Sequence, residues 1–128
     1  SIMAALARVD TSALRRMTIS RAEYAWLIYP TSPFASPPMQ QPPQLSWFME
    51  TSDSEVGFAR LISRLGGRRL DLLGTRCPAT TSREGRNEIV SGCSVRLRED
   101  GAARELRLFG PLVGRDGTWK VLTWSNAF

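Results

Sequence analysis

Apolar residues in the first 67 positions recur every three or four residues, which is the spacing of one face of a helix. Between residues 2 and 17 this pattern predicts helix, with a break near Asp10 because Asp, Thr and Ser favour caps over helix interiors. Ser20 and Glu23 have the spacing of a capping box, in which each side chain bonds the backbone N–H of the other. We therefore expect a helix that begins after Ser20 and ends at Tyr29, because Pro30 follows.

Six of the eight prolines lie in residues 30–43, so this segment is predicted to be a long extended loop. It is either a linker or a loop that wraps across the domain, and the small size of both flanking pieces favours the wrap. Residues 45–49 then suggest a short helical turn. A second capping box at Ser52–Glu55 predicts a separate amphipathic helix, which Gly66 and Gly67 should end.

After Gly67 the pattern changes to strands separated by short turns. Strands are expected at 69–77, 88–99, 103–113 and 118–126, with turns at Glu84-Gly85, Asp100-Gly101 and Asp116-Gly117. Strands joined in this way form an antiparallel meander. We therefore predict one α+β domain over 1–128: a helical half at 1–67 with the loop at 30–43, packed on a curved four-stranded antiparallel sheet at 68–128.

Alternation along these strands sorts their side chains between two faces of the sheet. The face expected to meet the helices carries Leu73, Val95, Leu97, Leu106, Leu108, Leu112, Trp119 and Val121. The other face is cationic but also holds large apolar residues: Arg96, Arg98, Arg107, Phe109, Lys120, Leu122 and Trp124. Exposed apolar groups on this face indicate a partner surface, such as a homodimer contact, unless the sheet curls to bury them.

The two cysteines are expected to lie opposite each other. If the first hairpin is centred on Gly85, Cys77 faces Cys93, Thr75 faces Val95 and Leu73 faces Leu97. Cβ atoms of directly opposed residues are about 4.5–5.5 Å apart, which is close to disulfide reach. We therefore predict a Cys77–Cys93 disulfide, and two buried thiols are the alternative. A disulfide would favour a periplasmic or secreted location, whereas free thiols would leave the cytoplasm open.

Composition excludes several kinds of chemistry. The chain has 128 residues, a net charge of +5 and no histidine. Without histidine, Ser-His-Asp and Cys-His nucleophile pairs are impossible, and two cysteines alone cannot close a zinc site, so no metal or cofactor is expected. The arginines are dispersed from Arg8 to Arg115, which disfavours nucleic acid as a partner. No apolar stretch approaches the roughly 18 residues of a transmembrane helix, and no signal peptide is apparent at the first residues.

The order of helices and strands, together with the sequence Arg-Asp-Gly-Thr-Trp-Lys-Val at 115–121, resembles the NTF2-like (cystatin-like α+β) superfamily. The resemblance implies a curved sheet wrapped around the helices, a cone-shaped pocket between them, and frequent dimerisation through the sheet. Enzymes of the superfamily often place His, Asp or Tyr in that pocket. Here histidine is absent, and Asp71, Asp100 and Asp116 fall at strand ends or turns.

Three functions remain open. The first, which we favour, is a non-enzymatic domain that binds a small apolar ligand or a protein. Its candidate pocket residues are Tyr24, Trp26, Tyr29, Trp47 and Trp119, for each of which core packing is the alternative role. The second is a small hydratase- or isomerase-type enzyme that uses tyrosine and carboxylates: Glu23, Tyr24, Tyr29 and Glu50. The third is an anionic-partner surface on the cationic face, with Phe109 or Trp124 for stacking.

Overall fold

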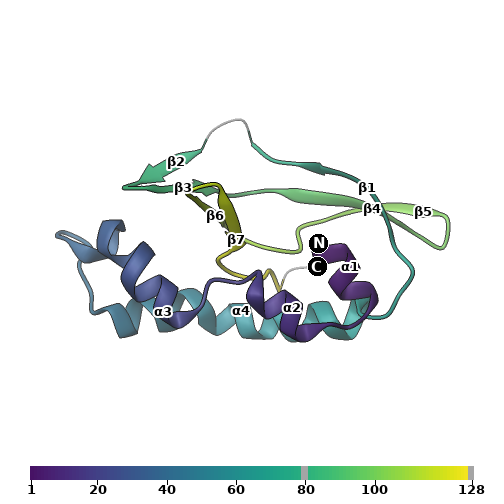
Figure 1. Cartoon of the computed structure of the whole chain (residues 1–128), viewed down its shortest axis with the longest axis horizontal. Helices are drawn as coiled ribbons and strands as arrows, with labels where there is room; N and C mark the ends of the chain where they lie inside the picture. Colours follow the sequence, from purple (N-terminus) through teal and green to yellow (C-terminus); the bar gives the residue numbers. More distant parts are fainter. Residues whose placement is uncertain (79–80, 127–128) are drawn as a thin grey trace.

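The computed structural model describes residues 1–78 and 81–126, and the expected α+β class is correct. Helices form one layer and strands form the other (Figure 1). The helical elements are α1 (Ile2–Ala7), α2 (Thr11–Arg16), α3 (Arg21–Glu23), the π-helical η1 (Tyr24–Ile28), the 3₁₀ turns η2 (Tyr29–Thr31) and η3 (Pro33–Ala35), and α4 (Pro43–Leu65). Residues 79–80 and 127–128 of the predicted meander lie outside the described part.

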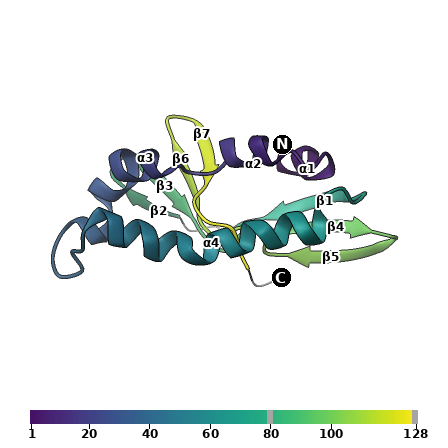
Figure 2. The same ribbon diagram turned by 90° about the horizontal axis from the view of Figure 1, so that it is seen from below.

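The first helical row is broken where the sequence indicated. Asp10 caps α2 by accepting a hydrogen bond from the Ala13 amide, and it follows Val9, whose φ is 52°. The Ser20–Glu23 capping box is confirmed, with both reciprocal hydrogen bonds present. The row runs in one direction along the molecule, residues 36–42 turn the chain at one end, and α4 returns beside it (Figure 2).

The prediction of two separate helical pieces at 45–65 was wrong, because α4 is one helix of 23 residues. It begins at Pro43, a residue that suits the first helical position because its missing N–H is not needed there. The hydroxyl of Thr51 donates to the Trp47 carbonyl at 2.7 Å, one turn earlier in the same helix. Hydroxyl side chains can be accommodated in this way inside a helix. Because α4 continues through Ser52, the Ser52–Glu55 motif does not mark a helix start.

The strands form two sheets rather than the single four-stranded sheet that we predicted. Strands β1, β4 and β5 make one sheet, and β2, β3, β6 and β7 make the other, in the order β2-β3-β6-β7. The first hairpin is interrupted near Cys77 and at Gly92, whose φ is 82°, so its two halves join different sheets. The bounds are β1 Asp71–Arg76, β2 Ser82–Glu84, β3 Asn87–Val90, β4 Ser94–Glu99, β5 Ala102–Leu106, β6 Leu112–Arg115 and β7 Thr118–Val121.

The register of the first hairpin agrees with the prediction beside the cysteines and departs from it on both sides. Near the turn, Arg83 is opposite Glu88 and Glu84 is opposite Asn87, so the hairpin is centred between Gly85 and Arg86 and not on Gly85. Thr75 is opposite Val95, as expected. A bulge between Leu72 and Gly74 then puts Leu72, instead of Leu73, opposite Leu97. The placement of Leu73 on the buried face was therefore wrong, because one extra residue in a strand shifts every position beyond it.

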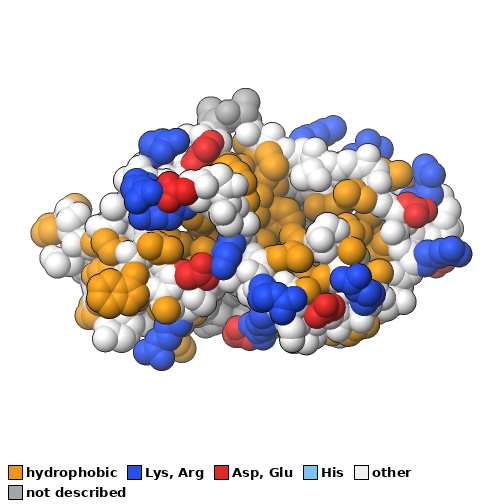
Figure 3. Space-filling model, viewed as in Figure 1, with side chains coloured by type: hydrophobic (Ala, Val, Ile, Leu, Met, Phe, Trp, Pro, Cys, Tyr) orange, Lys and Arg blue, Asp and Glu red, His pale blue; other side chains and the backbone are white. Residues whose placement is uncertain are grey.

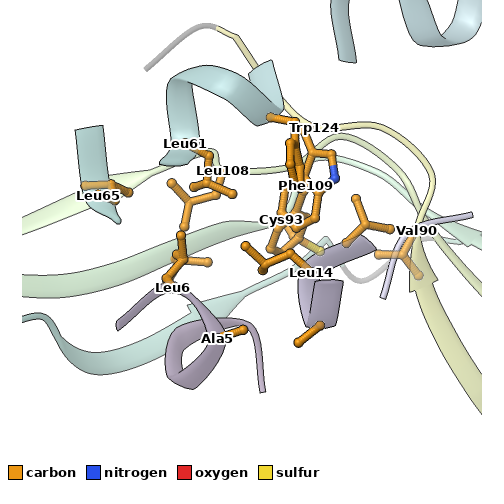
Figure 4. Close-up of a cluster of buried hydrophobic side chains, with 14 residues drawn as sticks. Ala5, Leu6, Leu14, Leu61, Leu65, Val90, Cys93, Leu108, Phe109 and Trp124 are labelled. Carbon is orange, nitrogen blue, oxygen red and sulfur yellow. The ribbon is translucent and has the colours of Figure 1, made fainter. Parts of the chain in front are cut away.

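The main core lies between α1, α2 and α4 on one side and β4 with the segments around Leu108 and Trp124 on the other (Figure 4). A smaller core joins Ile19, Tyr24 and Ile28 to Val113 and Leu122. Because α4 runs below both sheets in Figure 1, one helix supports both cores.

Three residues that we assigned to the solvent face are in fact buried: Phe109, Leu122 and Trp124. Strand β5 ends at Leu106 and β7 at Val121, so strand alternation does not apply to the residues that follow. An isolated bridge pairs Phe109 with Trp124, and the Trp124 amide donates to Ser54 of α4 at 2.9 Å. The opposite error concerns Trp119, which we placed on the buried face and which is 47% exposed.

Candidate ligand pocket

A small pocket lies between the helical row and the four-stranded sheet. Its volume is about 110 Å³. The floor is apolar and the rim carries charged and polar groups; the lining residues are Ile19, Glu23, Leu27, Ile28, Asn87, Val113, Arg115, Thr118 and Lys120. Figure 3 shows apolar side chains across the middle of one face of the molecule, with charged side chains around them.

Residues 17–19 fix the helical row against the sheet at this pocket. The Val121 amide donates to the Met17 carbonyl and the Ile19 amide donates to the Val121 carbonyl, both at 2.8 Å. These bonds occupy the outer edge of β7 and bring Ile19 into the smaller core. The Ser20 cap then starts the next helix at once, so that Glu23 and Ile28 reach the pocket from the helical side.

One side of the rim is an ion pair between the two layers. The Lys120 ammonium donates to Glu23 Oε2 at 2.8 Å, and each side chain is 28% exposed. The other oxygen of Glu23 accepts the Ser20 amide at 2.9 Å. Burial alone would raise the pKa of Glu23, but the hydrogen bonds from Lys120 and Ser20 outweigh it, and the pKa is lowered. Glu23 is therefore ionised at neutral pH, and both of its carboxylate oxygens are held by hydrogen bonds from the protein.

The other side of the rim is a polar network around Asn87. This side chain is fully buried, and its Nδ2 donates to the Leu27 carbonyl at 2.7 Å. Arg115 Nη1 donates to Asn87 Oδ1 at 3.1 Å and to the same Leu27 carbonyl at 3.2 Å. Both hydrogen bonds from Arg115 use the same guanidinium nitrogen, Nη1. Arg115 lines both this pocket and the neighbouring groove that holds Trp119.

None of the five aromatic candidates lines this pocket. Tyr24 packs against Tyr29 and Trp47, with ring centroids 6.5 and 5.3 Å apart, and its hydroxyl hydrogen-bonds Ser46. Trp26 is 80% exposed on the outside of the helical row. Trp47 instead lines a groove of about 280 Å³ between α2 and α4. Trp119 lines a different groove of about 310 Å³, together with Arg83, Arg86 and Arg115.

The pocket residues that sequence reasoning missed are mainly Asn87 and Arg115. Asn87 lies between the predicted Glu84-Gly85 turn and the strand predicted from residue 88, so the sequence pattern assigned it no role. Its bond to Leu27 joins residues 60 positions apart, and no local pattern predicts such a contact. A polar residue at the start of an apolar strand was the one available signal, because a buried amide must find hydrogen-bond partners.

The cationic face is only partly as predicted. Arg96, Arg98 and Arg107 are exposed, but Lys120 belongs to the pocket rim, and Phe109 and Trp124 are buried. The aromatic residues expected to stack on a partner there are therefore unavailable. Glu105 lies among these arginines. A hydrogen bond from Ser94 lowers the pKa of Glu105, and Arg76, Arg96 and Arg107 lower it further.

Two other carboxylates lie near the tyrosine cluster. Burial raises the pKa of Glu50, and the charge of Glu84 raises it further. Burial also raises the pKa of Glu84. The pKa of Tyr24 is raised by burial and, to a smaller extent, by the negative charges of Glu50 and Glu84. Neither Glu50 nor Glu84 makes a side-chain hydrogen bond or ion pair within the described residues. Raised carboxyl pKa values accompany acid–base sites, but also follow simply from packing under a sheet.

The Cys77–Cys93 disulfide is confirmed, with Cα atoms 4.1 Å apart. It joins the chain at the point where the first hairpin passes from one sheet to the other. Cys93 is buried in the main core, whereas Cys77 is exposed. The bond therefore fixes the junction of the two sheets to the core.

No protein-family model, curated protein or solved structure matches the chain. Across residues 1–78 and 81–126, no group of three or more acidic or cysteine side chains is placed to hold a metal ion. No helix in that part of the chain has the length and apolarity needed to cross a membrane.

Proposed function

We propose that this protein is a non-enzymatic binding domain whose pocket takes a small apolar ligand with an anionic group. The observation that carries the proposal is the pairing of an apolar floor with Arg115 on the rim. Ile19, Ile28 and Val113 give the floor its apolar character. Among residues 1–78 and 81–126, Arg115 uses only Nη1 for hydrogen bonds to the protein, and the rest of its planar guanidinium suits a carboxylate.

The size of the pocket limits the ligand. A cavity of about 110 Å³ is smaller than those that enclose drug-sized ligands, so a short aliphatic chain or a single ring is the appropriate class. The ion pair between Glu23 and Lys120 places a negative and a positive charge on the opposite rim. That pair is neutral overall, so Arg115 determines the preference for the charge of the ligand.

The test is titration with butanoate, hexanoate and benzoate, each followed by amide chemical shifts, with hexanol as the uncharged control. We expect the acids to shift amides of residues 19–28 and 113–120. Arg115→Gln should weaken hexanoate binding about tenfold and leave hexanol unaffected, because it removes a charge-assisted hydrogen bond. Arg83→Gln is the matched control, because Arg83 is exposed and does not line the pocket.

The proposal fails if neither the acids nor hexanol moves the pocket amides. Equal weakening by Arg115→Gln and Arg83→Gln would also contradict it, because net charge alone would then explain the loss. The thermal unfolding of each variant must match that of the unmodified protein, since Arg115 also supports Asn87.

The catalytic alternative is less well supported by the geometry. Glu23 is committed to Lys120 and Ser20, and the hydroxyls of Tyr24 and Tyr29 are bonded to Ser46 and to the Gln41 carbonyl. Glu50 has a raised pKa, but it lies away from the pocket described above. We therefore favour binding over catalysis.

We also propose an NTF2-like relationship and an oxidising compartment for this protein. Helices followed by antiparallel strands, with a pocket between the layers, support the relationship at the level of element order. The disulfide supports a periplasmic or secreted location, because structural disulfides persist where thiols are not kept reduced. Mass measurement of the protein purified from its native compartment, with free thiols alkylated, tests the second point.

A further inference from the structure

We infer that the free edge of β1 is a homodimer interface, in which β1 pairs antiparallel with β1 of a second copy. This contact differs from the dimer through a sheet face that the sequence suggested. It would join two three-stranded sheets into one continuous sheet of six strands. The inference is independent of the ligand pocket, which lies at the other sheet.

The first observation is that β1 is an edge without a neighbour. Strand β4 pairs with β1 on one side and with β5 on the other, so the second side of β1 has no strand partner in the described chain. The corresponding edge of β7, by contrast, is bonded at Val121 to residues 17–19. An exposed edge presents backbone N–H and C=O groups that pair readily with another strand.

The second observation is that β1 is complementary to itself. If two copies pair about the midpoint between Leu73 and Gly74, Asp71 of each copy lies opposite Arg76 of the other, and Leu72 lies opposite Thr75. A two-fold axis repeats each contact, so the interface gains two ion pairs. Oppositely charged residues directly across a strand pair stabilise the pairing.

The faces of the sheet agree with this register. Leu72 and Thr75 are opposite Leu97 and Val95, which are both buried, so both lie on the inner face. Asp71 and Arg76 are opposite Arg98 and Ser94, which share the other face by alternation. Each pair therefore meets on one side of the extended sheet, as antiparallel pairing requires.

The third observation is an apolar surface directly below this edge. Leu72 is 54% exposed, and it lines a cleft of about 190 Å³ together with Ile2 and Met3 of α1. The adjacent Leu73 is also exposed. A second copy at the β1 edge would remove these side chains from water, which a monomer leaves exposed.

The test is sedimentation velocity over a range of concentrations, with three variants. The unmodified protein should show a concentration-dependent dimer. Arg76→Asp should weaken the dimer at least tenfold, because both ion pairs become like-charge contacts, and adding Asp71→Arg should restore it. Leu72→Lys should also weaken it, whereas Val56→Lys should not, because Val56 is equally exposed (52%) but lies on α4.

A readout that needs no variant is dilution of isotope-labelled protein, in which amides of residues 71–76 should shift and those of residues 112–121 should not. A monomer at all concentrations up to the millimolar range would overturn the inference. So would a dimer that tolerates both Arg76→Asp and Leu72→Lys. Thermal melting of each variant identifies loss of fold, and a folded double variant that stays monomeric would contradict the proposed register.

Discussion

The indole of Trp119 occupies the space directly in front of Gly114. The two residues are paired across β6 and β7, and a Cβ atom built on Gly114 would lie 2.6 Å from Cε2 and Cζ2 of the ring. Gly114 is thus required by the tryptophan that covers it. This packing also explains how a large side chain can lie on the outside of the sheet and still contact it over a wide area.

Gly114→Ala should therefore lower the free energy of unfolding by about 1–3 kcal/mol, as overpacked sites generally do. The double variant Gly114→Ala/Trp119→Leu should recover most of that loss, because the indole ring that the alanine methyl group would contact is no longer there. Denaturant unfolding of the single and double variants measures the effect. Gly74→Ala is the control, since an added Cβ there meets no atom within 4 Å. Equal losses at positions 114 and 74 would contradict the assignment.

Gly57 plays a similar role on the helical side. It lies inside α4, where alanine is normally more favourable by about 1 kcal/mol. Here a Cβ would lie 2.5 Å from the Ser125 carbonyl oxygen and 2.6 Å from that of Trp124, and backbone cannot move aside easily. We therefore expect Gly57→Ala to destabilise the protein by several kcal/mol despite its better helix propensity.

The control for Gly57 is Ser52→Ala in the same helix. Ser52 is exposed in the interior of α4 and is not the N-cap that its sequence suggested. Its replacement should leave stability unchanged or raise it slightly, as measured by thermal unfolding. A loss of about 1 kcal/mol, typical of a removed N-cap, would instead support a helix start at Ser52.

Sequence patterns predicted this structure well where the determining contacts are local. The Ser20–Glu23 cap and the pairing of Cys77 with Cys93 each depend on residues in one turn or one hairpin. The burial of Trp124 depends on Ser54 and Phe58 of α4 and on Thr18 before the Ser20 cap. Alternation cannot report such contacts, because Trp124 lies beyond the end of β7.

The candidate pocket was harder to predict for the same reason. Its position between the helices and the sheet follows from the layer arrangement, which element order indicates. Its lining does not, because Asn87 and Arg115 meet the Leu27 carbonyl across the two layers. Three of the five aromatic residues chosen for the site, Tyr24, Tyr29 and Trp47, pack against one another beside α4 instead, where large rings contribute most through burial. Trp26 and Trp119 are exposed.

The disulfide should contribute substantially to stability. Cys77 and Cys93 are 16 residues apart, and a loop of this length corresponds to about 3 kcal/mol in the chain-entropy model. Reduction under native conditions should lower the thermal midpoint, and Cys77→Ala/Cys93→Ala should show the same loss without reductant. The doubly substituted protein is the control for the reductant itself, because it should be insensitive to it. Unchanged unfolding on reduction would show that the core alone fixes the junction of the two sheets.

Glu50 should destabilise the protein at neutral pH. Burial and the nearby charge of Glu84 raise the pKa of Glu50, so the folded state binds a proton more readily than the unfolded chain does. For such an acid, the destabilisation appears as the pH rises above the unfolded value of about 4.3 and is complete above the folded pKa.

Glu50→Gln should therefore raise the thermal midpoint at pH 7, and the difference should disappear on acidification to about pH 3, where both side chains are neutral. Glu23→Gln is the opposite case, because the pKa of Glu23 is lowered. That variant should lose stability at pH 7, and its deficit should shrink as the pH falls through the folded pKa of Glu23. Thermal unfolding of both variants from pH 3 to pH 8 tests the two signs together. If Glu50→Gln were destabilising at pH 7, Glu50 would have to make a favourable interaction as an anion, and the direction inferred for its pKa would be wrong.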